Sequence, residues 1–382
     1  MDFAFGGGDD EFRAEVRAWL CGRVEEGLER RAWERMLGKG GWIGLSWGES
    51  GYRNRSAGLT QQVVWAEEYA RSGAPARSGH IGENLLAPTL LAHGTEEQRA
   101  RFLPPIAAGE ELWCQGYSEP GAGSDLAGVS TRAERAADGS YRITGQKIWT
   151  SLAHEADWCF VLARTEAGSV RHRGLSFLLV PMDQPGRIEV RPIRQMTGTS
   201  EFNEVFFDGA HARAEHLVGG EGDGWNVAMS LLGFERGVST LAQQIGFAGE
   251  LQRIVRAAVD SGAAAGDPVL RERLVRQWAE LRVMRWNALR TLGSSGDAGA
   301  PSVAKLLWGG WHQRLGELAV SVRGAGAAVG PVPWSEATPY ELDAAQHLFM
   351  FSRADTIYGG SDQIQRTIIA ERVLGLPREP KG

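Results

Sequence analysis

The chain has 382 residues, enough for two or three packed units, and its content of hydrophobic residues (43%) and charged residues (23%) is ordinary for a globular protein. No apolar run approaches the roughly 18 to 20 residues that span a bilayer, and a net charge of −6 provides no basic field for nucleic acid. We therefore expect neither a membrane protein nor a nucleic-acid-binding protein. The N-terminus carries acidic residues where an export signal would carry Lys or Arg, so we expect a cytoplasmic location.

The cysteines and histidines do not have the spacing of a metal site. Cys21, Cys114 and Cys159 are isolated from one another, without a C-x-x-C pair, and we expect reduced thiols in the core. His211 and His216 are interpreted as a pair of loop residues rather than as ligands. No metal site is predicted.

The first part of the chain, residues 1–112, is predicted to be an N-terminal helical domain. Apolar residues recur at helical spacing from Glu11 to about Arg101, which favours a bundle of helices. Thr95 and Gln98 form a capping box at the start of the last of these helices. The Pro104-Pro105 pair is expected to end that helix before the character of the sequence changes.

Residues 113–218 are predicted to form a middle antiparallel β domain. Turn dipeptides, Asp138-Gly139 and Pro185-Gly186, separate short runs of β-branched and aromatic residues, and no long helical pattern intervenes. These runs lie at residues 141–144, 158–162, 175–180 and 204–207.

Residues 219–382 return to a helical period, which predicts a C-terminal helical domain of the four-helix-bundle type. Asp267 followed by Pro268 is typical of an N-cap with Pro at the first helical position. The fold class is therefore α+β, in the order α, β, α.

The glycine-rich run GAGAAVG at 324–330 superficially matches a nicotinamide-binding turn. Such a turn follows a strand and opens into a helix, whereas Pro331 and Pro333 obstruct a helix here and the preceding residues have a helical pattern. The run is better interpreted as a helix end followed by a turn.

Three segments carry a resemblance to one known family. They are WCQGYSEPGAGSDLAGVSTRAERAADGSYRITGQKIWTS at 113–151, GWNVAMSLLGFERG at 224–237 and IYGGSDQIQRTIIAERVLG at 357–375. In kind and order they resemble the signatures of the acyl-CoA dehydrogenases, whose architecture is also α, β, α. The resemblance implies FAD-dependent α,β-desaturation of an acyl-CoA thioester, oxidation by electron-transferring flavoprotein, and a homotetramer.

Glu235 is the predicted general base. It lies near apolar helix positions, where burial would raise its pKa into a useful range, although the residues alone favour an ordinary ion pair with an Arg. The resemblance is to the isovaleryl-CoA type of enzyme, whose base occupies the position of Glu235. Other relatives have Tyr-Glu-Gly where this chain has Tyr358-Gly359-Gly360, and the resemblance implies that the N–H of Gly359 serves the oxyanion hole.

The resemblance also implies the flavin contacts. Ser118 and Ser151 would donate hydrogen bonds to the ring edge next to Tyr117, and Trp149 would pack against the ring, the alternative being that Trp149 is an ordinary core residue. At the last signature, Ser361 would cap a helix running through Ile368. Further matched positions are Gln363 for FAD, and Ser124 and Arg236 for the acyl-CoA; Ser124 has the alternative of a turn serine.

Two departures from the family pattern leave alternatives open. Arg323 stands where many relatives have a FAD-binding Gln, and the usual Arg-x-x-Phe-Gly segment is replaced by RERLVRQW. The resemblance favours an acyl-CoA dehydrogenase. The two alternatives are a flavin oxidase or dehydrogenase that acts on a carrier-protein thioester, and a non-catalytic or FAD-sharing subunit of a hetero-oligomer. The acyl group is not indicated by these motifs.

Overall fold

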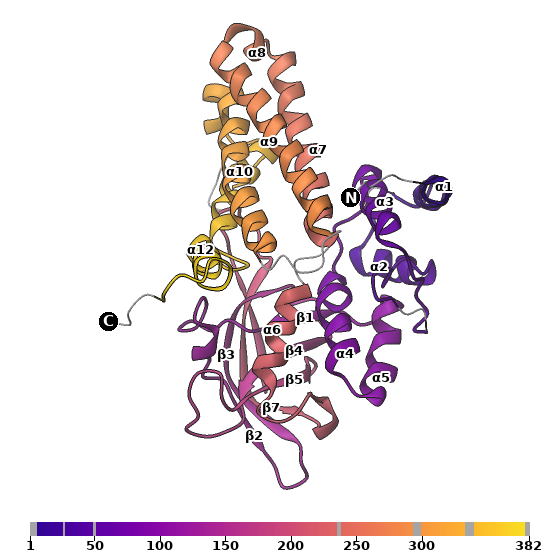
Figure 1. Cartoon of the computed structure of the whole chain (residues 1–382), viewed down its shortest axis with the longest axis vertical. Helices are drawn as coiled ribbons and strands as arrows, with labels where there is room; N and C mark the ends of the chain where they lie inside the picture. The colour runs from indigo at the N-terminus through magenta and orange to yellow at the C-terminus, as the bar shows by residue number, and fades with distance from the viewer. Residues whose placement is uncertain are drawn as a thin grey trace. The chain divides into compact units, whose positions relative to one another are not determined.

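The structure is a computed structural model that describes residues 6–25, 27–48, 51–234, 238–292, 299–332 and 340–378 (Figure 1). It forms two compact units, one of residues Phe5–Arg194 with Ser200–Arg236, the other of Met1–Ala4, Gln195–Thr199 and Gly237–Gly382. None of the helices within the described ranges is long and apolar enough to cross a membrane.

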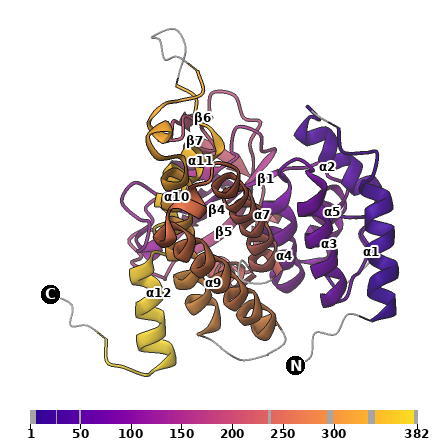
Figure 2. The same cartoon turned by 90° about the horizontal axis from the view of Figure 1, so that it is seen from above.

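The first unit begins with the predicted helices, which lie side by side in Figure 2. The capping box of the last helix is confirmed, since the Thr95 hydroxyl accepts from the N–H of Gln98. The prediction that Pro104 and Pro105 end this helix is wrong, because the helix continues to Ala107 and its apolar side chains at this end are buried. The helices are α1 (Gly7–Leu20), α2 (Arg30–Lys39), α3 (Leu59–Ser72), α4 (Ala87–His93) and α5 (Glu96–Ala107), with a π-helical turn at Gly82–Leu86 before α4.

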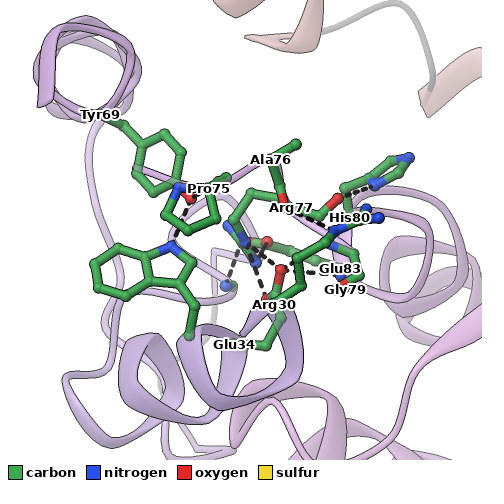
Figure 3. A network of polar contacts seen from close by, with 12 residues as sticks. Arg30, Glu34, Tyr69, Pro75, Ala76, Arg77, Gly79, His80 and Glu83 are labelled. Atoms are coloured by element: carbon green, nitrogen blue, oxygen red, sulfur yellow. Dashed lines mark hydrogen bonds and ion pairs between the residues drawn. The ribbon is translucent and has the colours of Figure 1, made fainter. Parts of the chain in front are cut away.

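A buried ionic network joins α2 to the loop and the π-helical turn that precede α4 (Figure 3). The guanidinium of Arg77 donates to Glu34 at 2.9 Å and to Glu83 at 2.7 Å. Glu34 also accepts from the backbone N–H groups of Ser78 and Gly79. Because both carboxylates are buried, removal of the arginine would leave two uncompensated charges, so the network stabilises the loop before α4.

The middle of the first unit is an eight-stranded sheet, which confirms the β domain. Its order is β6-β7-β3-β2-β4-β5-β8, with β1 beside β4. The pairs are antiparallel except β1 with β4 and β2 with β4, which are parallel. The strands are β1 (Trp113–Gly116), β2 (Arg132–Arg135), β3 (Tyr141–Ser151), β4 (Trp158–Arg164), β5 (Leu175–Pro181), β6 (Ile188–Ile193), β7 (Phe202–Ala212) and β8 (Leu217–Val218).

Two expectations about single residues need correction. Cys114 and Cys159 are free and buried, but Cys21 is exposed because it follows the last turn of α1 rather than lying on its apolar face. His211 belongs to strand β7 instead of a loop, pairing with Arg142 of β3, whereas His216 lies in a short 3₁₀ turn. Helix α6 (Gly224–Phe234) packs on β5 and ends the described part of this unit.

The second unit is the predicted C-terminal helical bundle, in which α7, α9 and α10 run side by side (Figure 1). The N-cap is confirmed, because Asp267 accepts from the N–H groups of Val269 and Leu270. The GAGAAVG run forms a 3₁₀ turn at Gly324–Ala328 after a helix, as expected. The helices are α7 (Val238–Asp260), α8 (Ala263–Gly266), α9 (Pro268–Leu292), α10 (Ala300–Arg323), α11 (Ala344–Phe351) and α12 (Asp362–Ile368).

Candidate active site

In the first unit, two neighbouring chain segments bring together the residues matched to flavin contacts. Tyr117 and Ser118 follow β1, and the carbonyl of Ser118 accepts from the N–H of Ile148 on β3 at 2.9 Å. Trp149 and Ser151 follow Ile148 on the same strand, and Ser151 is its last residue. The phenol of Tyr117 is buried against Phe160 and Phe177, whereas Ser118 and Ser151 are half-buried. The structure thus places the two segments that carry these four residues next to each other.

Trp149 is presented outward by an irregular piece of strand. The register between β3 and β7 shifts between Lys147 and Thr150, and Trp149 has a φ of 60°, so its side chain leaves the regular alternation. Trp149 is 57% exposed, which makes the alternative of an ordinary core residue wrong. An exposed aromatic face beside two serine hydroxyls suits a planar ring with polar edges, such as a flavin.

A buried ion pair lies next to the segments that carry these residues. The ammonium of Lys147 donates to the carboxylate of Glu119 at 2.9 Å, to the carbonyl of Tyr117 at 3.0 Å and to the carbonyl of Leu162 at 2.8 Å. Glu119 also accepts from the N–H of Ser130 and of Thr131. Burial raises the pKa of Glu119, but Lys147 and the other donors outweigh it and lower the pKa to about 2. Burial lowers the pKa of Lys147 in turn; three acceptors fit the charged ammonium, so we treat the two as an ion pair.

Ser124, matched to an acyl-CoA contact, is exposed in the loop after a turn in which Glu119 and Ala122 exchange backbone hydrogen bonds. Neither neighbouring glycine, Gly121 or Gly123, would bring a Cβ within 4 Å of another group. The space around these glycines is therefore open, and a ligand can approach the backbone of the loop closely.

In the second unit, the matched residues lie on one turn and the helix that follows it. Gly359 and Gly360 have φ of 63° and 81°, a left-handed backbone that glycine adopts without strain. The predicted cap is confirmed, since Ser361 precedes α12, which ends at Ile368, and its hydroxyl accepts from the N–H of Ile364. Gln363 is exposed in the first turn of the helix.

A cluster of polar side chains next to this turn, all of them buried except Tyr358, was missed by the sequence analysis. Asp355 lies at its centre, in contact with His312, Tyr358 and Lys305. A lysine within the apolar run VAKLLW of α10 was the available signal, because a charged residue on a packed helix face implies a partner. Which partner it meets depends on the helix packing.

Glu235 and Arg236, the predicted base and a predicted acyl-CoA contact, lie outside the described residues. The described helices on either side are α6, ending at Phe234, and α7, beginning at Val238. Arg323, the departure noted at a FAD-binding position, forms an ion pair with Asp343 and donates to the carbonyl of Gly326.

Comparison with known proteins gives the family. Models of the N-terminal, middle and C-terminal domains of acyl-CoA dehydrogenases match residues 9–110, 114–210 and 222–374. The chain belongs to the acyl-CoA dehydrogenase family. The acyl-CoA dehydrogenase IpdE1 of Mycobacterium tuberculosis is 54% identical over 392 residues, covering 98% of this chain and 99% of its own length. The present chain, as a member of this family, is accordingly an oxidoreductase and a flavoprotein of lipid metabolism.

Solved structures agree with this assignment. The steroid acyl-CoA dehydrogenase Tcur3481-Tcur3483 superposes with a TM-score of 0.85 and 28% identity, covering 99% of this chain and 100% of its own. The ChsE4-ChsE5 complex from Mycobacterium tuberculosis gives a TM-score of 0.82 and 27% identity, covering 99% and 100%. Both similarities extend over the whole acyl-CoA dehydrogenase chain.

Proposed function

We propose that this acyl-CoA dehydrogenase desaturates the α,β bond of a bulky acyl-CoA, with FAD as its cofactor and Glu235 as its base. The observation that carries the proposal is the combination of a glycine at position 359, where other relatives have a carboxylate, with a glutamate at 235. Ser118, Ser151 and Trp149 would bind the flavin ring, and Ser361 and Gln363 would bind FAD at the start of α12.

The proposed reaction divides the work among these residues. Glu235 would accept the α-proton. FAD, held by Ser118, Ser151 and Trp149, would supply the acceptor for the hydrogen that leaves the β-carbon with its electron pair, so that the two carbons are joined by a double bond. The N–H of Gly359 donates to the thioester oxygen as negative charge develops there. Ser124 and Arg236 hold the CoA part. Electron-transferring flavoprotein is the proposed oxidant of the reduced enzyme.

A polycyclic, steroid-derived acyl group is the proposed substrate class. A structural relative is named a steroid acyl-CoA dehydrogenase. In this chain a Cβ at Gly359 would meet a single group within 4 Å, Cε of Lys305 at 3.8 Å, so space remains beside the turn. Both points favour an acyl group wider than a straight chain.

The experiment is anaerobic mixing of the purified yellow protein with straight-chain and polycyclic acyl-CoA thioesters, following loss of flavin absorbance. Glu235→Gln should keep FAD and substrate affinity and reduce the flavin about 100- to 10,000-fold more slowly, because a positioned general base is typically worth that factor. Bleaching of the Glu235→Gln variant at nearly the wild-type rate would show that the base lies elsewhere. Oxygen consumption by the reduced protein would favour the oxidase alternative. Turnover of a carrier-protein thioester, without turnover of any CoA thioester, would show that the substrate is bound to a carrier protein rather than to CoA.

A second candidate, a FAD-sharing subunit of a hetero-oligomer, is favoured by Arg323. Its pairing with Asp343 occupies the side chain at a position where relatives bind FAD. Helix α9 also exposes Val275, Trp278, Val283 and Trp286, an apolar face that suits a subunit interface. Two structural relatives are named as pairs of chains. A chain that is colourless alone and becomes yellow only when co-expressed with a related chain would establish this candidate; a yellow homotetramer would refute it.

A further inference from the structure

Helix α10 carries a face built to hold the segment that precedes the Gly359 turn. A Cβ on Gly309 would lie 3.1 Å from the carbonyl oxygen of Asp355, and one on Gly316 would lie 2.9 Å from Cα of Phe349. The backbone of α10 is therefore in close contact with the backbone of the residues that precede the turn. Lys305 and His312 lie one turn to either side of Gly309 on this helix. Both direct their polar atoms to Asp355.

Asp355 is the centre of this arrangement. It is almost completely buried, yet each of its polar oxygens has a partner. One carboxylate oxygen meets Nδ1 of His312 at 2.5 Å, the other accepts from the hydroxyl of Tyr358 at 2.7 Å, and the backbone carbonyl accepts from Nζ of Lys305. A buried aspartate whose two carboxylate oxygens and backbone carbonyl each have a donor has a single favourable orientation.

His312 is itself fixed from its other side. Its Nε2 lies 2.9 Å from the carboxylate of Glu250 on α7. Burial lowers the pKa of His312, but the hydrogen bonds and charges of Asp355 and Glu250 outweigh it and raise the pKa to about 9. At neutral pH the imidazolium therefore donates from both nitrogens, which connects α7, α10 and the segment at 355.

The network reaches the turn through Tyr358. Its hydroxyl is bound to Asp355 and its ring lies 4.7 Å from Nζ of Lys305. On the other side of the turn, Nε2 of Gln365 donates to the carbonyls of Gly359 and Gly360, each at 3.2 Å. Asp355 thus holds the side chain before the peptide unit between Tyr358 and Gly359, and Gln365 holds the carbonyl after it. The N–H of this peptide unit is the group assigned to the thioester oxygen.

We infer that Tyr358, held by Asp355 and His312, is a positioning residue for the reaction, because it sets the direction of the Gly359 N–H. The inference rests on the proposed function. A donor aimed at the developing oxyanion acts mainly in the transition state, so loosening it should lower kcat more than it raises KM.

The test compares Tyr358→Phe with Tyr340→Phe. The two tyrosines make a matched pair, since each is 38% exposed and each donates a 2.7 Å hydrogen bond, Tyr340 to the carbonyl of Met196. Each holoenzyme is measured for FAD content, apparent Tm, flavin reduction by an acyl-CoA substrate, and the absorbance change on binding acetoacetyl-CoA, whose enolate reports polarisation of the thioester carbonyl.

Tyr358→Phe should lower kcat about tenfold and weaken the acetoacetyl-CoA signal, with KM, FAD content and Tm close to the wild type; full loss of an oxyanion donor costs about 100- to 1,000-fold. Tyr340→Phe should match the wild type in all four. Equal kcat in both variants, or a loss in Tyr358→Phe that Tm or FAD content explains, overturns the inference. A wild type that binds FAD but is never reduced by any thioester overturns the proposed function itself. Asp355→Asn, where it folds, should exceed the loss of Tyr358→Phe.

Discussion

Lys147 and Lys305 are both buried lysines, one in each compact unit, and their surroundings differ. The ammonium of Lys147 is fully enclosed and donates to three acceptors, one of them the carboxylate of Glu119. Lys305 is 7% exposed as a residue, and its ammonium, among the described residues, donates to the carbonyl of Asp355 while facing the rings of Trp308 and Tyr358. Burial lowers the pKa of each.

The difference shows that acceptors, rather than burial, decide what a buried lysine does. Three acceptors satisfy all three N–H groups of Lys147, so this side chain holds a fixed position next to the segments that carry the candidate flavin contacts. For Lys305, burial lowers the pKa to about 8, and the nearby carboxylates of Asp355 and Asp362 only partly offset it. A lysine with that pKa can change charge in an ordinary buffer.

The largest expected effect is on Lys147. Lys147→Met should destabilise the protein by about 3 to 5 kcal/mol, because Glu119 is left as an uncompensated buried charge. Lys147→Met with Glu119→Gln should recover a large part of this loss, and Lys305→Met should cost far less than Lys147→Met. Denaturant unfolding of the three variants measures the difference. Equal losses of the free energy of unfolding in Lys147→Met and Lys305→Met would show that the two lysines do not differ in their contribution to stability.

The next effect is the pH dependence that His312 gives to the second unit. Its folded pKa, about 9, lies above the ordinary value of 6.5, so its stabilisation is fully present below about pH 6.5 and is lost as pH rises to about 9. A shift of this size corresponds to stability on the order of 3 kcal/mol. Apparent Tm should fall across this interval in the wild type and much less in His312→Gln. Parallel Tm curves for the two proteins would contradict the imidazolium assignment.

A smaller effect concerns Gly359, the neighbour of Lys305. The φ of 63° means that any side chain adds backbone strain, on the order of 1 to 2 kcal/mol, independent of the substrate. Gly359→Ala therefore serves as the control for Gly359→Leu. Relative to Ala, the Leu variant should discriminate against polycyclic thioesters by about 1 to 3 kcal/mol more, measured as the kcat/KM ratio to a straight-chain substrate. An unchanged ratio would mean that position 359 does not shape the acyl site.

The last expected effect is the titration of Lys305, which runs in the opposite direction to that of His312. Its folded pKa of about 8 is below the ordinary 10.5, so the folded state loses its proton first and stability rises with pH between about 8 and 10.5. The overlapping loss from His312 is removed by working in the His312→Gln background. There, Lys305→Met should abolish the rise in Tm over this interval, and a rise that survives would assign it to another group.

Local patterns predicted the elements well where the deciding contacts are close in sequence. The caps at Thr95, Asp267 and Ser361 need only residues two or three positions away, and all three are present. Prediction failed where distant contacts decide the outcome. The Pro104-Pro105 pair was expected to end α5, but burial of that end of the helix against the core sustains it.

The candidate site divides in the same way. The motif positions Ser118, Trp149 and Gly359 were named from their sequence context, and the left-handed glycine turn and the cap after it follow from residues that adjoin one another. The exposure of Trp149 was not predictable from alternation, since the irregular register between β3 and β7 turns its side chain outward.

By itself, the sequence determined the family, the order of helical and β segments, the glycine turn and its capped helix, because these depend on motifs and short-range periodicity. Only the tertiary structure decided that Lys147 meets carbonyls from two other segments, and that His312 lies between Glu250 and Asp355, 62 and 43 residues away in the chain. Charges on packed faces need partners, but the packing of helices and strands chooses which residues become those partners.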